Sequence, residues 1–305
     1  MIDFKALKNK LEEICNSEAD FTFECEMKNY TTFHIGGKAS LAVFPHTRKA
    51  LCDIAEYLSV NNIKYVVIGN GSNVLFADEG YNGVVLFTVK LKSFYFDENT
   101  LFADAGASVT LMAQTAVKKG YDGFAFACGI PGSVGGAVYM NAGAYGGEIS
   151  DILLYSEYFD TISRKTVRLD NKSHDFGYRH SFYSNKNHVI LGAAFSLVKA
   201  EDPAQQRALM EEHLKSRAAK QPLQYPSAGS VFKRYPGYYT AQLIDRAGLK
   251  GFCVGGAQVS QKHAGFIINR GNATCADVLE LIDIIKKKIY DMEGINIECE
   301  VRYID

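Results

Sequence analysis

The sequence predicts a protein that mixes helices and strands and that folds as more than one domain. Apolar β-branched runs alternate with amphipathic segments, the pattern changes near Ala200, and the chain has 305 residues. A chain of this length is long for a single domain. Its 47% hydrophobic and 22% charged residues are the content of an ordinary globular protein.

The first segment reads MIDFKALKNKLEEIC, and its apolar residues recur at helical spacing among charges. We therefore expect an amphipathic surface helix and no secretory signal peptide, which needs a continuous apolar region. No stretch reaches the roughly 20 apolar residues of a membrane span. Because the net charge is −1, the sequence predicts neither a nucleic-acid partner nor a membrane partner.

Between residues 40 and 120, short apolar runs typical of buried strands alternate with helical segments. Thr47 is the expected N-cap of one helix, and Ser108 is that of another helix that ends at Gly120. The stretch FYFDENTLFADAG predicts a hairpin that turns at residues 97–99. The other expected strands of this part are SLAVFP, KYVVIG, NVLF and GVVLFTV.

From residue 152 to 198 the chain is rich in expected strands, which are LLYSEYFD, KTVRLD and HVILGAAFSLVK. Asp202 is the expected N-cap of a long helix, and we place a domain boundary just before it, near Ala200. Thr274 is expected to cap a last helix, with Lys286 to Lys288 in its final turns, where the helix dipole favours cations. A final strand, INIECEVRYI, is expected after it.

The seven cysteines and seven histidines are scattered through the chain. The cysteine count is odd, and the spacings CxxC, HxxH and HxxxH do not occur. The sequence therefore predicts no disulfide framework and no metal site. A reducing, cytoplasmic location fits this use of cysteine best.

A first glycine-rich loop, Gly69 to Asn73, directly follows the expected strand KYVVIG. Inward backbone N–H groups in such a loop form an anion-binding nest, and glycine lets a phosphate come close. The loop is not a GxGxxG fingerprint, because a strand is expected after it, and it lacks the GK[ST] of a Walker A loop. On spacing alone, a tight hairpin is the stronger interpretation.

A second glycine-rich stretch, GIPGSVGGAVYMNAGAYGGE, extends from Gly129 to Glu148 and holds seven glycines. A flexible linker should be hydrophilic, but this stretch contains several large apolar residues, among them Ile130, Val138 and Tyr145. We therefore expect its backbone to be buried against something. A planar heteroaromatic cofactor and tight protein packing both fit, and residue chemistry alone leaves both alternatives open.

Seven stretches stand out along the chain: NYTTFHIGGKA, VIGNGSNVLFADEGYNGVV, GIPGSVGGAVYMNAGAYGGE, FGYRHSFY, YPSAGSVFKR, AGLKGFCVGGAQVSQKHAGFIIN and ECEVR. Together they resemble the UDP-N-acetylenolpyruvoylglucosamine reductase family and occur in the family's order. They extend from about Asn29 to Arg302, nearly the whole chain, and their combination is very specific. The span from Arg179 to Ser230 is short, which resembles the family branch without the tyrosine-bearing loop.

The resemblance implies an α+β fold in which FAD lies between two subdomains of the vanillyl-alcohol-oxidase (PCMH) type. A third, C-terminal α+β domain would bind the substrate. The expected boundaries are 1–91 and 92–199 for the FAD-binding subdomains and 200–305 for the substrate-binding domain. The implied FAD contacts are Gly69, Asn70, Gly71, Ser72 and Asn73 at the pyrophosphate, and Gly129, Ile130, Pro131, Gly132, Ser133, Gly135 and Gly136 along the cofactor.

The implied activity is an NADPH-dependent reduction of UDP-N-acetylglucosamine enolpyruvate to UDP-N-acetylmuramate in peptidoglycan synthesis. NADPH reduces FAD, and the reduced flavin gives a hydride to the vinyl ether of the enolpyruvyl group. Negative charge develops beside the carboxylate, so the site needs fixed positive charge, hydrogen-bond donors and a proton donor. This substrate and NADPH are the expected partners of a protein that is expected to be monomeric.

Three residues match the family's catalytic groups. Arg179, in FGYRHSF, would fork onto the carboxylate, since its guanidinium stays charged. Ser230, in SAGSVF, would be the proton donor. Glu300, in ECEVR, would donate a hydrogen bond in its protonated form or act through a water. Glu298 would share a strand face with Glu300, so the motif alone selects between them.

For the UDP half of the substrate, the resemblance points to Lys220 and Lys250, because lysine supplies point charges for a diphosphate. Tyr178, Arg234 and His263 are further candidates, and an ordinary surface role is the alternative for each of them.

Two other function classes stay open. A flavin oxidase of the same superfamily, acting on another substrate, would keep both glycine-rich loops but would not need the three catalytic residues together. A non-catalytic FAD- or UDP-sugar-binding protein would hold flavin without NADPH turnover.

Overall fold

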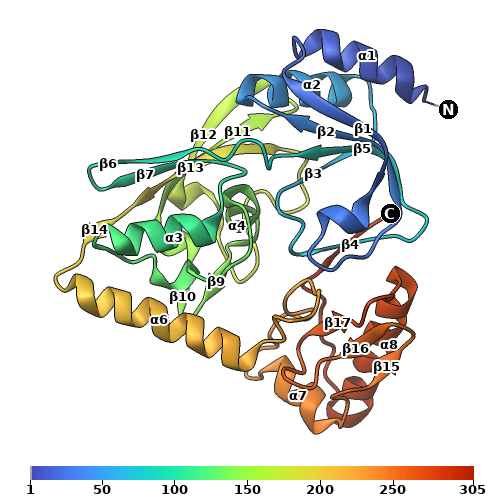
Figure 1. Ribbon diagram of the computed structural model, residues 1–305, viewed down its shortest axis with the longest axis vertical. Helices are drawn as coiled ribbons and strands as arrows, with labels where there is room; N and C mark the ends of the chain where they lie inside the picture. The colour runs from blue at the N-terminus through green and yellow to red at the C-terminus, as the bar shows by residue number, and fades with distance from the viewer. Residues whose placement is uncertain (1) are drawn as a thin grey trace. The chain divides into compact units, whose positions relative to one another are not determined.

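The computed structural model describes residues 2–305, which form two compact units (Figure 1). The first unit consists of the chain up to Phe23, Leu41–Asn70 and Gly83–Ser216. The second consists of Glu24–Ser40, Gly71–Asn82 and Arg217–Asp305. The division into three domains at residues 91 and 199 stays a prediction.

Most of a four-stranded sheet belongs to the first unit. The apolar faces of two helices pack with this sheet in one buried cluster. Leu11 of α1 (Phe4–Ile14), Leu51 of α2 (Arg48–Val60) and Val84 of the sheet are fully buried in that cluster. The predicted cap Thr47 is confirmed, since its hydroxyl accepts the N–H of Ala50 at 3.1 Å. The strand order is β1 (Ala19–Glu26), β2 (Lys38–Pro45), β5 (Tyr81–Phe87) and β3 (Tyr65–Ile68).

A five-stranded antiparallel sheet lies entirely in the first unit. The predicted hairpin is confirmed, because Asp97 pairs with Thr100 and leaves residues 98–99 as its turn. The three strands predicted between residues 152 and 198 are also present. The strand order is β12 (Lys165–Asp170), β11 (Leu153–Asp160), β13 (Val189–Ser196), β7 (Thr100–Asp104) and β6 (Phe94–Asp97).

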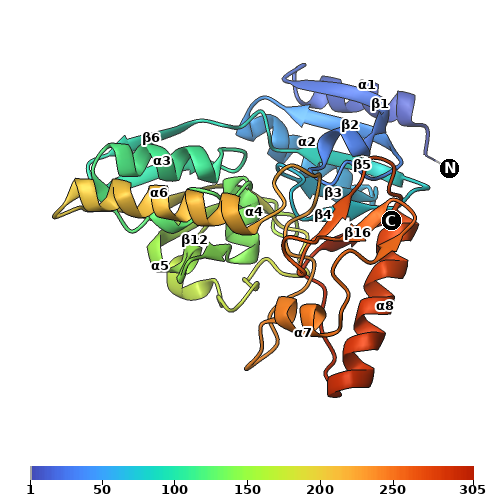
Figure 2. The same ribbon diagram turned by 60° about the horizontal axis from the view of Figure 1, so that its bottom comes forward.

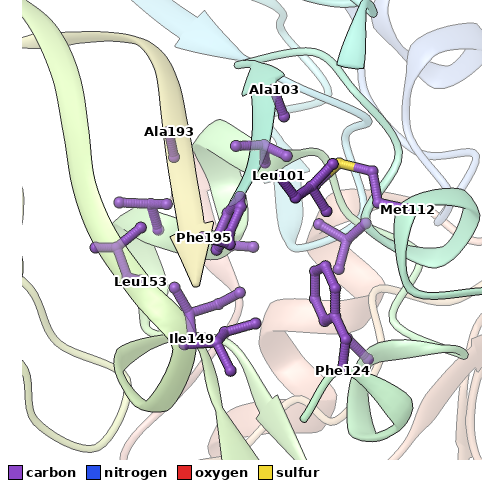
Figure 3. Close-up of a cluster of buried hydrophobic side chains, with 14 of the residues drawn as sticks. Leu101, Ala103, Met112, Phe124, Ile149, Leu153, Ala193 and Phe195 are labelled. Atoms are coloured by element: carbon purple, nitrogen blue, oxygen red, sulfur yellow. The ribbon is translucent and has the colours of Figure 1, made fainter. Parts of the chain in front are cut away.

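The largest apolar cluster of the first unit lies between this sheet and its helices. Figure 3 shows Leu101 and Phe195 of the sheet pointing toward Met112 of α3 and toward Phe124. Burial of these side chains is the main favourable term that holds the layers together. The helices are α3 (Val109–Lys118), α4 (Val134–Met140), α5 (Ile149–Ile152), the 3-10 turn η2 (Ala125–Ala127) and α6 (Pro203–Lys220), which reaches the cluster through Met210 and Leu214.

The caps predicted for these helices are confirmed. Ser108 accepts the N–H of Leu111, and Asp202 accepts the N–H of Ala204 at 2.8 Å. Gly120 follows α3 at φ +79°, a backbone conformation that favours glycine. Two short strand pairs complete the unit: β8 (Tyr121–Asp122) with β14 (Val198–Lys199), and β9 (Gly143–Ala144) with β10 (Gly147–Glu148).

The second unit packs α8 (Cys275–Glu293) along a three-stranded sheet, as Figures 1 and 2 show. Thr274 caps α8 as predicted, since its hydroxyl accepts the N–H of Asp277, and the Asp277 carboxylate accepts the N–H of Thr274. The remaining elements are η1 (Met27–Tyr30), α7 (Thr240–Arg246), the sheet β15 (Cys253–Val254), β16 (Ala257–Val259) and β17 (Ile267–Asn269), and the parallel pair β4 (Val74–Phe76) with β18 (Arg302–Ile304).

Two expectations near the C-terminus are wrong. α8 continues to Glu293 and has no basic residue in its last turn, because Gly294 at φ +66°, not the lysine run 286–288, ends it. The expected strand INIECEVRYI is reduced to β18. The residues before β18 do not pair with β4, and Cys299 forms an isolated bridge with Phe232 instead.

No helix within residues 2–305 is long and apolar enough to cross a membrane. The described residues also contain no group of three histidine, cysteine or acidic side chains that could hold a metal ion.

Candidate active site

Gly69 and Asn70 of the first glycine-rich loop contact the second glycine-rich segment within the first unit. The first loop is not a hairpin, because β3 pairs with β5 whereas β4, after the loop, pairs with β18. A Cβ atom on Gly69 would lie 2.0 Å from the Oγ of Ser133. Asn70 donates a hydrogen bond from Nδ2 to the carbonyl of Pro131 at 3.3 Å. Gly69 is therefore bare because the second segment occupies the space of its side chain.

The second segment presents fixed main chain. The Ile130 carbonyl accepts a hydrogen bond from Thr110 Oγ1 at 2.6 Å, and the Cys128 carbonyl accepts one from Gln114 at 3.3 Å. Ser133 is buried and caps α4, whereas residues 129–132 and 135–136 stay partly or fully accessible. A partly accessible, glycine-rich segment with an anchored backbone fits a flat cofactor such as FAD. The residues present are thus suited to hold that group.

Arg179 lies in a tight turn of the first unit. The backbone N–H groups of Gly177 and His180 each donate to the other residue's carbonyl, at 3.2 and 3.1 Å. Arg179 has φ +56°, which is uncommon for a residue with a side chain. Its Nη2 donates to the carbonyl of Gly143 at 3.3 Å. The structure therefore brings the predicted arginine to the second glycine-rich segment, with the neighbouring Tyr178 ring 4.9 Å from the guanidinium carbon.

Ser230 and Glu300 come together in the second unit. The N–H of Glu300 donates to the carbonyl of Val231, the residue after Ser230, at 2.7 Å. The Ser230 hydroxyl donates to the carbonyl of Phe232 at 3.2 Å. Both side chains are half-buried. Two of the three predicted catalytic residues thus lie on adjoining backbone segments.

The structure also separates Glu300 from Glu298. Glu298 is an exposed residue whose carboxylate lies 3.1 Å from Lys233 Nζ, and its side chain is 75% accessible. The expectation that the two glutamates share a strand face is wrong, because this part of the chain is not a strand. Glu298 is therefore a surface ion-pair residue, and such pairs contribute little to stability.

Among the candidates for the UDP half, His263 and Lys250 lie close together in the second unit. His263 Nδ1 accepts the N–H of Gly265 at 3.1 Å, so its ring proton is on Nε2. Burial lowers the pKa of His263, and the charge of Lys250 lowers it further. Lys250 Nζ itself lies 2.6 Å from Asp245 Oδ2.

The other candidates for the UDP half are exposed. Lys220 lies at the end of α6, and Arg234 lies over the ring of Tyr239 at 5.2 Å from its centre. Tyr178 is exposed in the turn of Arg179.

The sequence did not predict the supporting role of three polar residues that hold the site's backbone. Asn73 donates from Nδ2 to the carbonyl of Glu300 at 3.0 Å. Asn141 donates to the carbonyl of Gly177 at 3.2 Å, and Ser181 donates to the carbonyl of Tyr139 at 2.7 Å. All three stand inside the quoted stretches. Their roles depend on contacts between distant segments, which a single sequence does not display.

Comparisons with known proteins agree with this geometry. A FAD binding domain model matches residues 39–163, and a model of the UDP-N-acetylenolpyruvoylglucosamine reductase C-terminal domain matches residues 221–304. The chain is 46% identical over 293 residues to the UDP-N-acetylenolpyruvoylglucosamine reductase of Caldicellulosiruptor bescii, covering 95% of this chain and 92% of that one. It is 41% identical over 304 residues to that of Clostridium novyi, covering 100% and 98%.

A solved structure supports the same relationship. The crystal structure of the reductase from Thermus caldophilus matches with a TM-score of 0.79 and 31% identity, covering 94% of this chain and 99% of that one. The α+β class, with a FAD-binding fold followed by a C-terminal reductase domain, is thereby confirmed. From its sequence, its fold and its relatives, this chain belongs to the UDP-N-acetylenolpyruvoylglucosamine reductase family.

Proposed function

We propose that Arg179, Ser230 and Glu300 carry out the family's reduction of UDP-N-acetylglucosamine enolpyruvate in this chain. The protein is a FAD-containing, NADPH-dependent oxidoreductase of peptidoglycan synthesis, and its product is UDP-N-acetylmuramate. The observation that best supports the residue roles is the hydrogen bond that holds the Arg179 guanidinium to the carbonyl of Gly143 in the second glycine-rich segment.

FAD, when bound, supplies the hydride chemistry by accepting a hydride from NADPH and delivering one to the vinyl ether. The cofactor contacts we propose are the residues of the two glycine-rich segments. They are Gly69, Asn70, Gly71, Ser72, Asn73, Gly129, Ile130, Pro131, Gly132, Ser133, Gly135 and Gly136.

Each catalytic side chain has a distinct task. Arg179 provides permanent positive charge for the substrate carboxylate and for the negative charge that develops beside it. Ser230 gives its hydroxyl proton to the carbon next to that carboxylate. Its hydrogen bond to the Phe232 carbonyl orders the hydroxyl, and a rotation about χ1 turns the proton toward the substrate. Glu300 donates a hydrogen bond to the developing enolate.

The UDP half is proposed to bind in the C-terminal region, residues 200–305. Lys250 and Lys220 supply positive charge for the diphosphate, and the neutral His263 offers its Nε2–H as a donor. Arg234 and Tyr178 are the other proposed substrate contacts. The FAD-binding subdomains would be residues 1–91 and 92–199.

The protein is proposed to act as a monomer in the cytoplasm, without a nucleic-acid or membrane partner. A net charge of −1 supports this proposal, because it offers no general attraction to polyanions.

Anaerobic stopped-flow spectroscopy tests the function. NADPH should bleach the bound flavin, and UDP-N-acetylglucosamine enolpyruvate should then restore its colour. A flavin oxidase would instead regain colour with oxygen and would be bleached by an alcohol substrate. A protein that only binds flavin would keep its colour when NADPH is added.

A further inference from the structure

Three polar side chains form a buried cluster next to the turn that carries Arg179. Ser156 of β11, His174 and Tyr183 are at most 1% exposed. The Ser156 hydroxyl oxygen lies 2.7 Å from His174 Nε2 and 2.5 Å from the Tyr183 hydroxyl oxygen. The opposite ring nitrogen of His174, Nδ1, lies 3.0 Å from the carbonyl oxygen of Asp170.

These distances fix the order of the protons. The carbonyl of Asp170 can only accept, so His174 Nδ1 carries a proton and donates it. In the neutral ring Nε2 then accepts from the Ser156 hydroxyl, whose oxygen accepts in turn from Tyr183. Burial lowers the pKa of His174 and raises that of Tyr183, so both side chains stay neutral. Every member of the cluster has a hydrogen-bond partner, which a buried polar group requires.

The cluster lies at the base of the loop that presents Arg179. His174 and Tyr183 are the two ends of that loop, and the N–H of Phe182 donates to the carbonyl of His174. The His174 ring also stacks on Phe176, with ring centres 4.7 Å apart. Ser156 links both ends of the loop to the five-stranded sheet.

The turn inside the loop needs support from the surrounding structure. Arg179 has φ +56°, and an unfavourable backbone conformation persists only when the surrounding structure enforces it. Two hydrogen bonds hold the turn against the second glycine-rich segment. The Asn141 side chain donates to the carbonyl of Gly177, and the Ser181 hydroxyl donates to the carbonyl of Tyr139. The cluster holds the two ends of the loop together through Ser156.

We infer that Ser156, His174 and Tyr183 are positioning residues that fix the direction of the Arg179 guanidinium for the reaction. This inference rests on the role proposed above for Arg179. The three side chains do not touch the reacting groups; they act by holding the two ends of the loop at one distance. A small shift of a charged group at a reacting centre can cost about a hundredfold in rate.

The half-reactions separate this role from a purely structural one. In Tyr183→Phe and Ser156→Ala, flavin reduction by NADPH should proceed at the wild-type rate, because Arg179 serves only the enolpyruvyl substrate. Flavin reoxidation by that substrate should slow by about tenfold or more. The matched control is Tyr65→Phe, which removes another tyrosine hydroxyl bonded to a serine, Ser59, at 2.9 Å. This control should leave both half-reactions unchanged.

A double-mutant cycle with Arg179→Lys completes the test. If the cluster acts through Arg179, adding Tyr183→Phe to Arg179→Lys should cause little further loss in reoxidation. Equal losses in both half-reactions, or full additivity with Arg179→Lys, would overturn the inference. If Arg179→Lys alone left reoxidation intact, the proposed role of Arg179 would fail first, which is a separate result. Melting temperatures of all variants show whether a loss comes from misfolding.

Discussion

The Asn73 side chain donates a hydrogen bond of 3.0 Å to the backbone carbonyl of Glu300. The carbonyl of Asn73 also accepts the N–H of Arg302 at 3.0 Å, so these two bonds extend the parallel pair of β4 and β18. A residue expected only at the FAD pyrophosphate therefore also anchors the segment that carries the proposed catalytic carboxyl.

Asn73→Ala should lower the free energy of unfolding by about 1–3 kcal/mol, because the Glu300 carbonyl loses a partly buried donor. It should also slow reoxidation by the enolpyruvyl substrate. Urea denaturation and stopped-flow spectroscopy measure the two effects. Asn61→Ala is the matched control, since its Nδ2 bonds the Tyr57 carbonyl at an exposed helix end. Equal behaviour of the two variants would show that Asn73 does not support Glu300.

Ser230→Ala should leave flavin reduction by NADPH nearly intact and slow reoxidation by orders of magnitude. The hydroxyl is the proposed proton source, and alanine offers no replacement. Single-turnover experiments on prereduced enzyme measure this step directly. Loss of both half-reactions together would contradict the assignment.

Glu300→Gln should also retain FAD and slow reoxidation, since an amide is a weaker hydrogen-bond donor to the developing enolate than a carboxylic acid. Glu298→Gln is its control two residues away and should behave as wild type, because Glu298 is paired with Lys233 on the surface. The same single-turnover assay compares the two. Full activity of the Glu300→Gln variant would remove Glu300 from the mechanism.

Gly69→Ala should yield protein with strongly reduced FAD content, because the new Cβ would lie 2.0 Å from Ser133 Oγ. Flavin absorbance per protein after purification measures the effect. Adding Ser133→Gly removes the clashing atoms and should recover part of the FAD content, despite the lost cap of α4. No recovery in the double variant would mean that the clash is not the cause.

Stability should fall as the pH drops below about 6.5, the ordinary pKa of histidine. Burial lowers the pKa of His174 in the folded state, so between that value and 6.5 the unfolded chain binds more protons. The unfolding free energy is therefore largest above 6.5 and decreases as the pH falls toward the folded pKa.

His174→Gln removes one such titration and should flatten the pH dependence by at most about 1.4 kcal/mol per pH unit. Tyr183→Phe, which disturbs the same cluster without removing the histidine, should keep the wild-type slope. Urea denaturation between pH 7.5 and 5.5 measures the slopes. An unchanged slope in His174→Gln would contradict the depressed pKa.

Local signals in the sequence predicted the elements well. The caps Thr47, Ser108 and Thr274 begin their helices as expected, because a side-chain oxygen meets a free N–H within the same turn. The hairpin at residues 97–100 is local in the same sense. The lysine run 286–288 lies before the last turn of its helix, which ends at Gly294.

Long-range features were beyond the sequence. The alternation of side chains along a strand could not distinguish Glu298 from Glu300, because residues 298–300 do not form a regular strand. The hairpin interpretation of residues 69–73 failed because β3 and β4 each pair with a distant strand. The family motifs pointed to Arg179 and Ser230 as site residues, but the cluster of Ser156, His174 and Tyr183 joins residues that only the fold brings together.

The pairing of β4 with β18 sets a condition on biosynthesis. Val74 can pair only after Arg302 has been synthesised, so this ladder cannot close early in translation. Removing the last four residues, which include β18, should therefore leave an exposed strand edge in every newly made molecule. A chain that stops before Arg302 would therefore be expected to aggregate instead of giving a shortened enzyme.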